Sequence, residues 1–403
     1  MKKLLLPAAF VLFCVLASAQ SANYYYEDGS FYFDAGDYPR AVDLWRAGTR
    51  ETPADTRLWF NLALAQLELH RYADAATSLR ALVVLTPDDA QAHQLLGTAY
   101  DGMGQYLYAA DAFGESYHLR PAPATLLLRA TVYRKAAELD LAEADYRSAL
   151  AAGADAALAH AGLGDVAAAR ADYPSAVDHY DAALRLAPAD ALTLYRRGRA
   201  KMALGYHDTA IFDLSRAIEL DPYLDEYYAG RALCRLEIAD PYGAAIDARR
   251  ARRYNPENAD AWFALGQLAA RENDYYAAAN GFNMALEIRD DNADYHYARG
   301  KVYHAIEAYL PAAEDFRVAS TLDPELAEID KWRSRAERAH AATLTTDTPL
   351  ADAPAPLPTP AEETPAAPAA YRPYVADESR RALPAERTDG DAIDSWMLAP
   401  DEQ

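Results

Sequence analysis

An alanine recurs at a nearly constant spacing through most of this 403-residue chain. Every step between successive members of the series is 34 residues except one, which is 33. The series comprises Ala41, Ala75, Ala109, Ala142, Ala176, Ala210, Ala244, Ala278 and Ala312. A fixed period of this length predicts a stack of similar structural units, each of which buries its apolar face against its neighbours.

One period, residues 157–190, predicts two helices joined by a tight turn. Apolar and small residues recur at three- and four-residue spacings on both sides of this turn, and Pro174 suits a first helical turn. Pro188 ends the second helix. The position of Gly164 is glycine or alanine in every period, so the helices are expected to approach one another closely.

This period and this pattern resemble the tetratricopeptide repeat (TPR) family. The resemblance implies an all-α fold, a right-handed α-solenoid of nine helical hairpins across residues 20–326. The hairpins are expected at about 22–55, 56–89, 90–122, 123–156, 157–190, 191–224, 225–258, 259–292 and 293–326. Residues 327–342 predict one further helix, which caps the open end of the stack.

Both ends of the chain differ from the repeats. Residues 1–19 combine two lysines, a short apolar core and a small-residue cleavage pattern, which predicts a secretory signal peptide cut before Gln20. Residues 343–403 are rich in proline, alanine and acidic groups and are predicted to be disordered. A segment around Trp396 regains apolar residues and is a candidate for folding back into the groove of the repeats, where it would compete with a partner. We therefore expect an exported bacterial protein, periplasmic or secreted.

Composition disfavours several classes of partner. The formal net charge of −22 disfavours nucleic acid and anionic lipid surfaces. No segment after residue 19 stays apolar for long enough to span a membrane, so no span is expected. Once the signal peptide is removed, Cys234 is the only cysteine, and no intramolecular disulfide can form.

The sequence carries no convincing catalytic or cofactor motif. Gly162, Gly164 and Ala167 match a dinucleotide-binding fingerprint, but they stand in phase with the other repeats. The histidines lack metal-ligand spacing, and His296 and His304 are assigned to packing or to the surface. Neither a nucleophile elbow nor a phosphate-binding loop is present. We predict no enzymatic activity, no cofactor and no metal.

Four repeats place an arginine where the others have leucine or aspartate, and each of the four has an aspartate 16 residues later. The predicted pairs are Arg129 with Asp145, Arg197 with Asp213, Arg231 with Asp247, and Arg299 with Asp315. An arginine at a packed position needs a carboxylate partner. We therefore predict four structural ion pairs between the two helices of a hairpin.

In TPR arrays the first helix of each hairpin lines a concave groove, and the resemblance implies that a partner binds there. The candidate binding residues are Tyr26, Phe60, Arg134, Tyr195, Arg199, Phe263, Arg271, Tyr297 and Lys301. Recognition surfaces favour aromatic residues and arginine. The carboxylate clamp of TPR proteins that bind chaperone C-termini is not expected, because the neighbours of Asn61 are not basic.

These observations predict a non-catalytic scaffold of the bacterial cell envelope that binds a protein or peptide partner in the groove. The alternative is a glycan-handling protein in polysaccharide export, because aromatic faces stack on sugars. About half of the 29 tyrosines fall at packing positions of the repeat, which favours the protein-binding interpretation.

Overall fold

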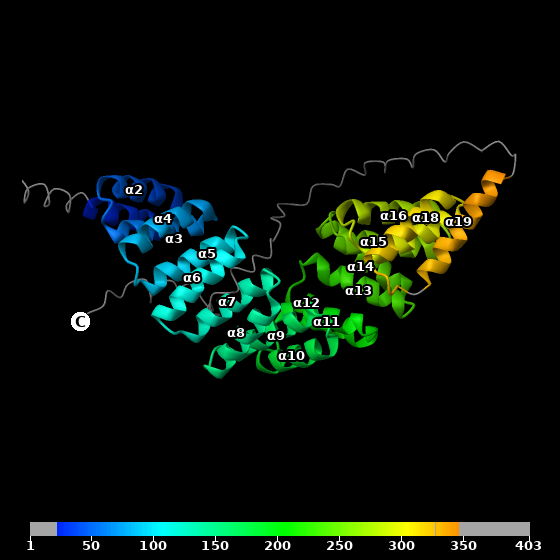
Figure 1. Cartoon of the computed structure of the whole chain (residues 1–403), viewed down its shortest axis with the longest axis horizontal. Helices are drawn as coiled ribbons and strands as arrows, with labels where there is room; N and C mark the ends of the chain where they lie inside the picture. Colours follow the sequence, from blue (N-terminus) through cyan, green and yellow to red (C-terminus); the bar gives the residue numbers. More distant parts are fainter. Residues whose placement is uncertain (1–21, 327, 346–403) are drawn as a thin grey trace, which may run out of the picture. The chain divides into compact units, whose positions relative to one another are not determined.

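The computed structural model describes residues 22–326 and 328–345 (Figure 1). Within these residues every regular element is a helix and none is a strand, so the prediction of an all-α solenoid of hairpins is confirmed. The chain divides into two compact units, here called unit 1 (described residues 22–170) and unit 2 (171–326 and 328–345). The predicted signal peptide and the tail that carries Trp396 lie outside the described residues.

Unit 1 is a series of antiparallel helices, in which α3 packs on α4, α5 on α6 and α7 on α8. It consists of a helix over residues 22–34, then α2 (Tyr38–Glu51), α3 (Thr56–Glu68), α4 (Tyr72–Leu85), α5 (Ala90–Gly102), α6 (Tyr106–Leu119), α7 (Pro123–Lys135), α8 (Leu139–Ala151) and α9 (Ala156–Ala169).

Unit 2 repeats the same arrangement, with hairpins α11–α12, α13–α14, α15–α16 and α17–α18. Its helices are α10 (Tyr173–Leu186), α11 (Ala191–Ala203), α12 (His207–Leu220), α13 (Asp225–Glu237), α14 (Pro241–Tyr254), α15 (Ala259–Arg271), α16 (Tyr275–Ile288), α17 (Ala293–Ala305), α18 (Tyr309–Leu322) and α19 (Ile329–Thr345). The division between the units falls inside the repeat expected at 157–190, where the residue pattern keeps its phase.

The helix α19 covers the last hairpin of unit 2, close to the position expected for a capping helix. It packs on α18, and its Ile329 and Ala336 are buried together with Phe316. Its bounds, Ile329–Thr345, lie slightly later than the predicted 327–342. No helix in the described part of the chain is both long and apolar enough to cross a membrane.

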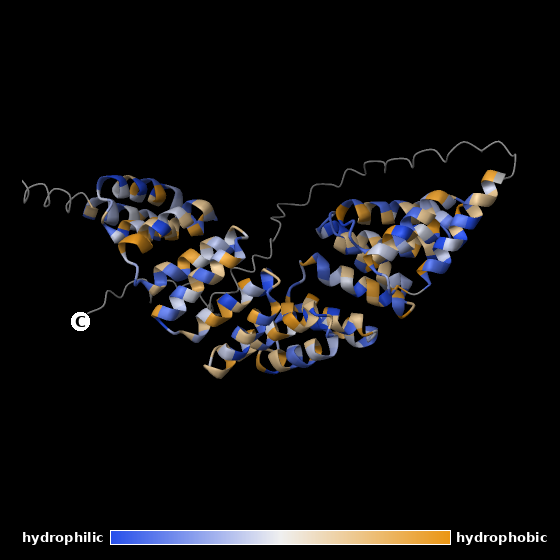
Figure 2. Ribbon diagram, in the orientation of Figure 1, coloured by the Kyte–Doolittle hydropathy of each residue, from blue (hydrophilic) through white to orange (hydrophobic). Residues whose placement is uncertain are grey.

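The recurring alanine marks the closest packing in both units. All nine alanines of the series are 0 % exposed. Larger apolar residues cluster around them, whereas polar residues occupy the outer sides of the helices, so hydrophobic and hydrophilic residues interleave along both units (Figure 2). Each hairpin thus buries one face against its neighbours, as a repeat architecture requires.

Many of the acidic residues have a local structural role at helix starts. The side chains of Asp37, Asp89, Asp155, Asp190 and Asp274 each accept a hydrogen bond from a backbone N–H in the first turn of the following helix. Such caps satisfy N–H groups that have no partner inside the helix. Part of the acidity of the chain is therefore explained by folding and requires no cationic ligand.

The first helix of each hairpin ends in a residue with positive φ, and this position also repeats along the chain. Glycine occupies it at Gly36, Gly104 and Gly205, but other residues hold the same conformation, with φ of 61° at Ala137 and 59° at Ala239. The Ala137 N–H donates to the carbonyl of Arg134, and the Glu138 N–H to that of Tyr133, which closes the helix. The Cβ of a non-glycine residue is strained in this region.

We expect Ala137→Gly and Ala239→Gly each to raise the free energy of unfolding by about 0.5–1 kcal/mol, because relief of left-handed strain outweighs the added freedom of glycine in the unfolded chain. Thermal unfolding followed by circular dichroism measures the effect. The reverse change, Gly205→Ala, places a Cβ at φ 76° and should be destabilising. Equal melting temperatures in all three variants would show that packing has removed the strain.

Successive first helices contact one another, namely α7 with α9 in unit 1 and α11, α13, α15 and α17 in series in unit 2. Successive second helices make no comparable contacts within the described residues. Unit 2 therefore curves with its first helices on the inner side. We call the solvent-facing side of α11, α13, α15 and α17 the inner face of unit 2.

Candidate functional site

All four arginine–aspartate pairs expected from the sequence are present as bidentate ion pairs. In each pair, Nε and one terminal nitrogen of the guanidinium donate to the two carboxylate oxygens, at distances of 2.5–2.9 Å. The four aspartates, Asp145, Asp213, Asp247 and Asp315, are all buried. Two parallel hydrogen bonds to a charged acceptor are among the strongest polar contacts in proteins.

Each buried aspartate in unit 2 has a further partner. Lys201 donates to Asp213 at 2.8 Å, Arg235 to Asp247 at 2.7 Å, and the His296 Nδ1 lies 3.0 Å from Asp315. These charges are compensated inside the hairpins. Because they are buried and already paired, they are structural and cannot bind a partner.

The arginines of these pairs also reach back to the preceding hairpin. The second terminal nitrogen of Arg197 donates to Asp181 on α10, that of Arg231 to Ser215 on α12, and that of Arg299 to Asn283 on α16. In each case the arginine thus connects the second helix of one hairpin with the second helix of the next.

Several of the predicted binding residues are occupied by contacts inside the protein. In unit 1, the Arg57 guanidinium lies 5.0 Å from the Tyr26 ring, Phe60 packs against a core cluster, and Arg134 lies 3.6 Å from Asp165. In unit 2, Arg271 donates to the carbonyl oxygen of Leu236 at 2.8 Å, close to the end of α13. Such residues hold the repeats together.

The assignment of Phe263 to the binding surface is wrong. Its side chain is only 7 % exposed and packs against Phe282 and Tyr295, with ring centroids 5.5 and 4.6 Å apart. Aromatic pairs at these separations are favourable core contacts. The repeat phase placed Phe263 on the inner side, but the ring of Phe282 in the same hairpin and that of Tyr295 in the next hairpin cover it.

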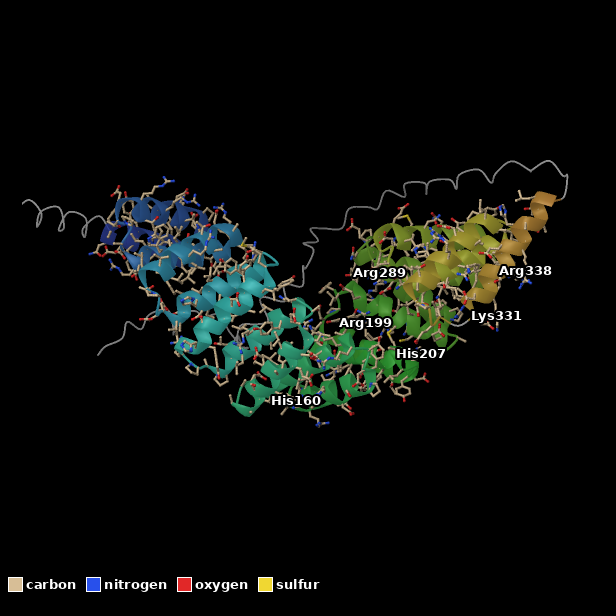
Figure 3. The ribbon with its side chains drawn as sticks, viewed as in Figure 1. His160, Arg199, His207, Arg289, Lys331 and Arg338 are labelled. Carbon is tan, nitrogen blue, oxygen red and sulfur yellow. The ribbon has the colours of Figure 1, made fainter. Side chains whose placement is uncertain are left out.

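Two cations on the inner face of unit 2 remain available. Arg199 on α11 and Lys301 on α17 are exposed, and neither forms an ion pair within the described residues (Figure 3 labels Arg199). Each lies over a tyrosine one turn earlier: the Arg199 Cζ is 5.9 Å from the Tyr195 ring, and the Lys301 Nζ is 5.0 Å from the Tyr297 ring. A cation held over a ring in this way is oriented yet still open to an anionic ligand.

The inner face also carries a row of carboxylates that the sequence argument missed. Glu226, Asp260 and Asp294 occupy the first turns of α13, α15 and α17, at the same phase of three successive repeats. Asp260 is held by Arg289 at 2.5 Å and accepts a hydrogen bond from the Tyr295 hydroxyl. Their regular 34-residue spacing in the sequence could have predicted that they line one face of unit 2.

Charges of both signs influence one another across this face. The pKa of Arg199 is raised by Tyr195 and by Asp260, whereas Arg289 on the same side of unit 2 opposes this effect (Figure 3). Burial raises the pKa of Asp294, and nearby Asp323 adds to the shift. The result is a surface of alternating cations, tyrosines and carboxylates, and not a uniformly charged one.

Glu226 is the carboxylate with the largest change in acidity on this face. Part of its side chain is exposed, but surrounding protein displaces water from the carboxyl group. This loss of solvent, together with the adjacent Asp225 carboxylate, raises the pKa of Glu226 to about 7. Asp225 itself accepts hydrogen bonds from Asn255 and Asn258.

The raised pKa predicts that the stability of unit 2 falls as pH rises. The folded protein holds the Glu226 proton up to a pH of about 7, whereas the unfolded chain loses it near its ordinary value, so stability is lost between these two values. We expect Glu226→Gln to stabilise the protein at pH 8 by roughly 1 kcal/mol, an amount reduced by solvent screening, and to have little effect at about pH 4, below both pKa values. Melting temperatures at both pH values test this, with Glu257→Gln as the control.

Other reactive side chains are engaged or buried. Burial raises the pKa of Cys234 to about 12, so its thiol stays protonated at neutral pH. His296 lies between Asp315 and the carbonyl of Asp290, whereas His304 packs against Tyr309 and Trp332. Within the described residues, no group of three or more His, Cys, Asp or Glu side chains is arranged to hold a metal ion.

Comparison with known proteins identifies the repeat. The chain matches the tetratricopeptide repeat over residues 29–90, 127–191 and 235–293, and a second description of the same repeat over 191–223. These matches cover more than half of the chain. The chain belongs to the tetratricopeptide repeat family. TPR repeats are protein-interaction modules, so the inner face of unit 2 is a candidate binding surface.

Solved TPR structures support the fold. A TPR protein from Parabacteroides merdae matches with a TM-score of 0.52 and 19% identity, over 59% of this chain and 94% of that one. A chain of the APC/C heterotetramer Cut9–Hcn1 matches with a TM-score of 0.54 and 17% identity, over 74% of this chain and 59% of that one. At such low identity these similarities concern the fold alone.

Two curated relatives share a short stretch of sequence. The heat-shock protein cognate co-chaperone sgt12 of Aspergillus fumigatus is 37% identical over 81 residues, which is 20% of this chain and 24% of the relative. The Hsp70-Hsp90 organizing protein of Triticum aestivum is 32% identical over 93 residues, which is 23% of this chain and 16% of the relative. This chain thus spans a quarter or less of the length of each relative.

Proposed function

We propose that the protein is a non-catalytic scaffold of the bacterial cell envelope that binds a protein partner on the inner face of unit 2. The observation that carries this proposal is the pair of exposed cations, Arg199 and Lys301. They lie over tyrosines, and neither forms an ion pair within the described residues. A partner segment with two carboxylates can pair with both cations. Its carboxylates replace water around side chains whose orientation the tyrosines already fix.

The engagement of the tyrosines favours a protein partner over a glycan. Tyr195 packs on Tyr227 at 5.1 Å and Tyr297 on Phe316 at 5.9 Å, in addition to their cations. Sugar stacking requires an open aromatic face, whereas each of these rings already contacts another ring and a cation. Arginine and tyrosine together are typical of the central residues of protein interfaces.

The proposed cell-envelope location rests on the sequence of residues 1–19. Its two lysines, apolar core and small-residue cleavage pattern are those of a secretory signal peptide. Cell fractionation combined with N-terminal sequencing tests this proposal: the mature protein is expected outside the cytoplasm and to begin at Gln20. An intact N-terminus in the cytoplasmic fraction contradicts it.

Photo-crosslinking in cells tests the binding surface. Gln267 on α15 occupies the same repeat position as Arg199 on α11 and Lys301 on α17 and lies between them along the stack. A photoreactive amino acid in its place is expected to capture a partner that mass spectrometry can identify. The double variant Arg199→Glu/Lys301→Glu should lose this capture, because it reverses both oriented charges. Arg80→Glu on α4 of unit 1 makes a comparable change at an exposed site and should retain it. Equal capture by all variants contradicts the proposal.

A further inference from the structure

The outward side of α14 combines exposed apolar and cationic residues in one line. Tyr242, Ile246, Arg249 and Arg253 follow one another at spacings of three and four and are all exposed, so they share a side of the helix. Tyr242 is 79 % exposed. Isolated apolar residues on a surface need no explanation, but a continuous line of them does.

Neighbouring second helices extend this line. Phe212 on α12 has the repeat phase of Ile246, and Tyr276 on α16 has the phase of Tyr242. Both are exposed, Phe212 by 71 %. Because equal phases face the same side in successive hairpins, these rings flank α14. We call Phe212, Tyr242, Ile246, Arg249, Arg253 and Tyr276 the α14 patch.

The cations of the patch are available. Arg249 and Arg253 form no ion pair within the part of the chain that the structure describes, whereas nearby Arg250 is stacked over Tyr228 and Tyr254. The one carboxylate on α14, Asp247, is buried and already bound to Arg231. The exposed side of α14 itself thus carries two arginines without an ion pair and no carboxylate, although Asp208 and Glu219 on α12 and Glu287 on α16 stand at the phases of Tyr242 and Arg253.

The end of the chain has the complementary composition. Residues 391–403 contain four large apolar residues, Ile393, Trp396, Met397 and Leu398, and four acids, Asp391, Asp394, Asp401 and Glu402, but no lysine or arginine. They lie outside the described residues. The last described helix, α19, belongs to unit 2, and the linker of about 45 residues between Thr345 and Asp391 can span up to roughly 150 Å. The segment can therefore reach any face of unit 2.

We propose that residues 391–403 dock on the α14 patch of the same chain. The apolar residues of the segment cover Tyr242, Ile246 and the flanking rings, and its carboxylates pair with Arg249 and Arg253. Because the segment is tethered, its effective concentration is of millimolar order, and even weak contacts suffice to hold it there. The α14 patch lies on a second helix, apart from the inner face, so a bound tail leaves Arg199 and Lys301 open.

Site-specific crosslinking in the full chain tests this docking. A photoreactive amino acid in place of Met397 should crosslink to residues 241–254, as mapped by mass spectrometry. Arg249→Glu/Arg253→Glu should lower the yield by at least about fivefold, because the two new glutamates repel the four carboxylates of the segment. The added changes Asp391→Lys/Asp394→Lys should restore it. Arg317→Glu, an exposed change on α18, is the matched control and should leave the yield unchanged.

Four results overturn the proposal: crosslinks that map to α11, α13 or α15 on the inner face, a yield insensitive to Arg249→Glu/Arg253→Glu, no crosslink at all, or crosslinks that join two different chains. Mixing isotope-labelled with unlabelled chains identifies the origin of the segment. Crosslinks between labelled and unlabelled chains indicate a second copy and contradict docking within one chain. Partner capture from the Gln267 position in the Arg249→Glu/Arg253→Glu variant reports separately on the proposed function.

Discussion

Replacing Asp213 with alanine is expected to lower the free energy of unfolding of unit 2 by about 3–5 kcal/mol. Its carboxylate is 0 % exposed and accepts hydrogen bonds from Arg197 and from Lys201. Removing it leaves two cations close together in a part of the hairpin that solvent barely reaches. Arg197 keeps only the partly exposed Asp181 as its partner, and Lys201 must stay unpaired or give up its proton, which also costs free energy.

The same guanidinium supplies the control. Asp181 binds the other terminal nitrogen of Arg197 at 2.6 Å, but 41% of its side chain is exposed. Asp181→Ala should therefore cost less than about 1 kcal/mol, as exposed ion pairs do. Urea unfolding of the full chain, followed by circular dichroism, compares the two variants. If both cost the same, burial is not the source of the effect.

A second control comes from repeats that lack the ion pair. At the two positions of the pair, the third repeat has Leu96 and Ala112, both in the core. The double variant Arg197→Leu/Asp213→Ala should recover most of the stability that Asp213→Ala loses, because apolar replacement of a buried pair is often neutral. Failure to recover would mean that Lys201 alone requires the carboxylate.

Gly281→Ala is expected to destabilise unit 2 by about 3 kcal/mol, because overpacking against backbone cannot be relieved by rotating a side chain. A Cβ at this position would lie 2.8 Å from the Gly266 Cα, 2.9 Å from its nitrogen and 3.1 Å from the Trp262 carbonyl oxygen. All three atoms belong to the backbone of α15, so α15 and α16 must move apart.

Gly230→Ala is the matched control on α13. A Cβ there meets nothing closer than 3.6 Å, and the nearest atom belongs to the Leu214 side chain. Because alanine favours the helix over glycine, this variant should gain up to about 1 kcal/mol. Opposite signs for the two substitutions in thermal unfolding are the expected result. A neutral Gly281→Ala would show that α15 and α16 do not need this close approach.

Gly281 occupies the repeat phase that aspartate fills in the four ion-paired repeats. There the arginine side chain lies between the two helices and is compensated by the carboxylate. In the eighth repeat, Leu265 replaces the arginine, and the helices meet backbone to backbone instead. The same position in the repeat therefore has two structural solutions, and a substitution at one cannot be transferred to the other.

The fold could be predicted because its signals are local and repeated. The alanine series marked the closest contacts, and the 16-residue spacing of arginine and aspartate indicated which side chains face one another in a hairpin. Both inferences depend only on the geometry inside one repeat. The periodic pattern also made every described helix predictable, including the approximate place of α19.

The candidate site was harder to predict, because the exposure of a side chain depends on its contacts with neighbouring helices. Phe263 has the phase of a groove residue, but the rings of Phe282 and Tyr295 cover it. Arg271 was expected to be available, but the Leu236 carbonyl oxygen lies within reach of its guanidinium. Glu226 and Asp260 were missed because they lie one helical turn before the repeat position that Phe263 and Tyr297 occupy, from which the candidate groove residues were chosen. The division after Arg170 has no counterpart in the residue pattern.

Every hairpin of unit 2 is tied to its predecessor by an arginine. Arg197, Arg231 and Arg299 donate to the second helix before them, and Arg271 donates to the first helix before it. When a terminal repeat peels away, the exposed end is thus left with a broken polar contact as well as bare apolar surface. Unit 2 should therefore melt as a block, without fraying repeat by repeat, and its amide protons should exchange with deuterium at similar rates from α11 to α17.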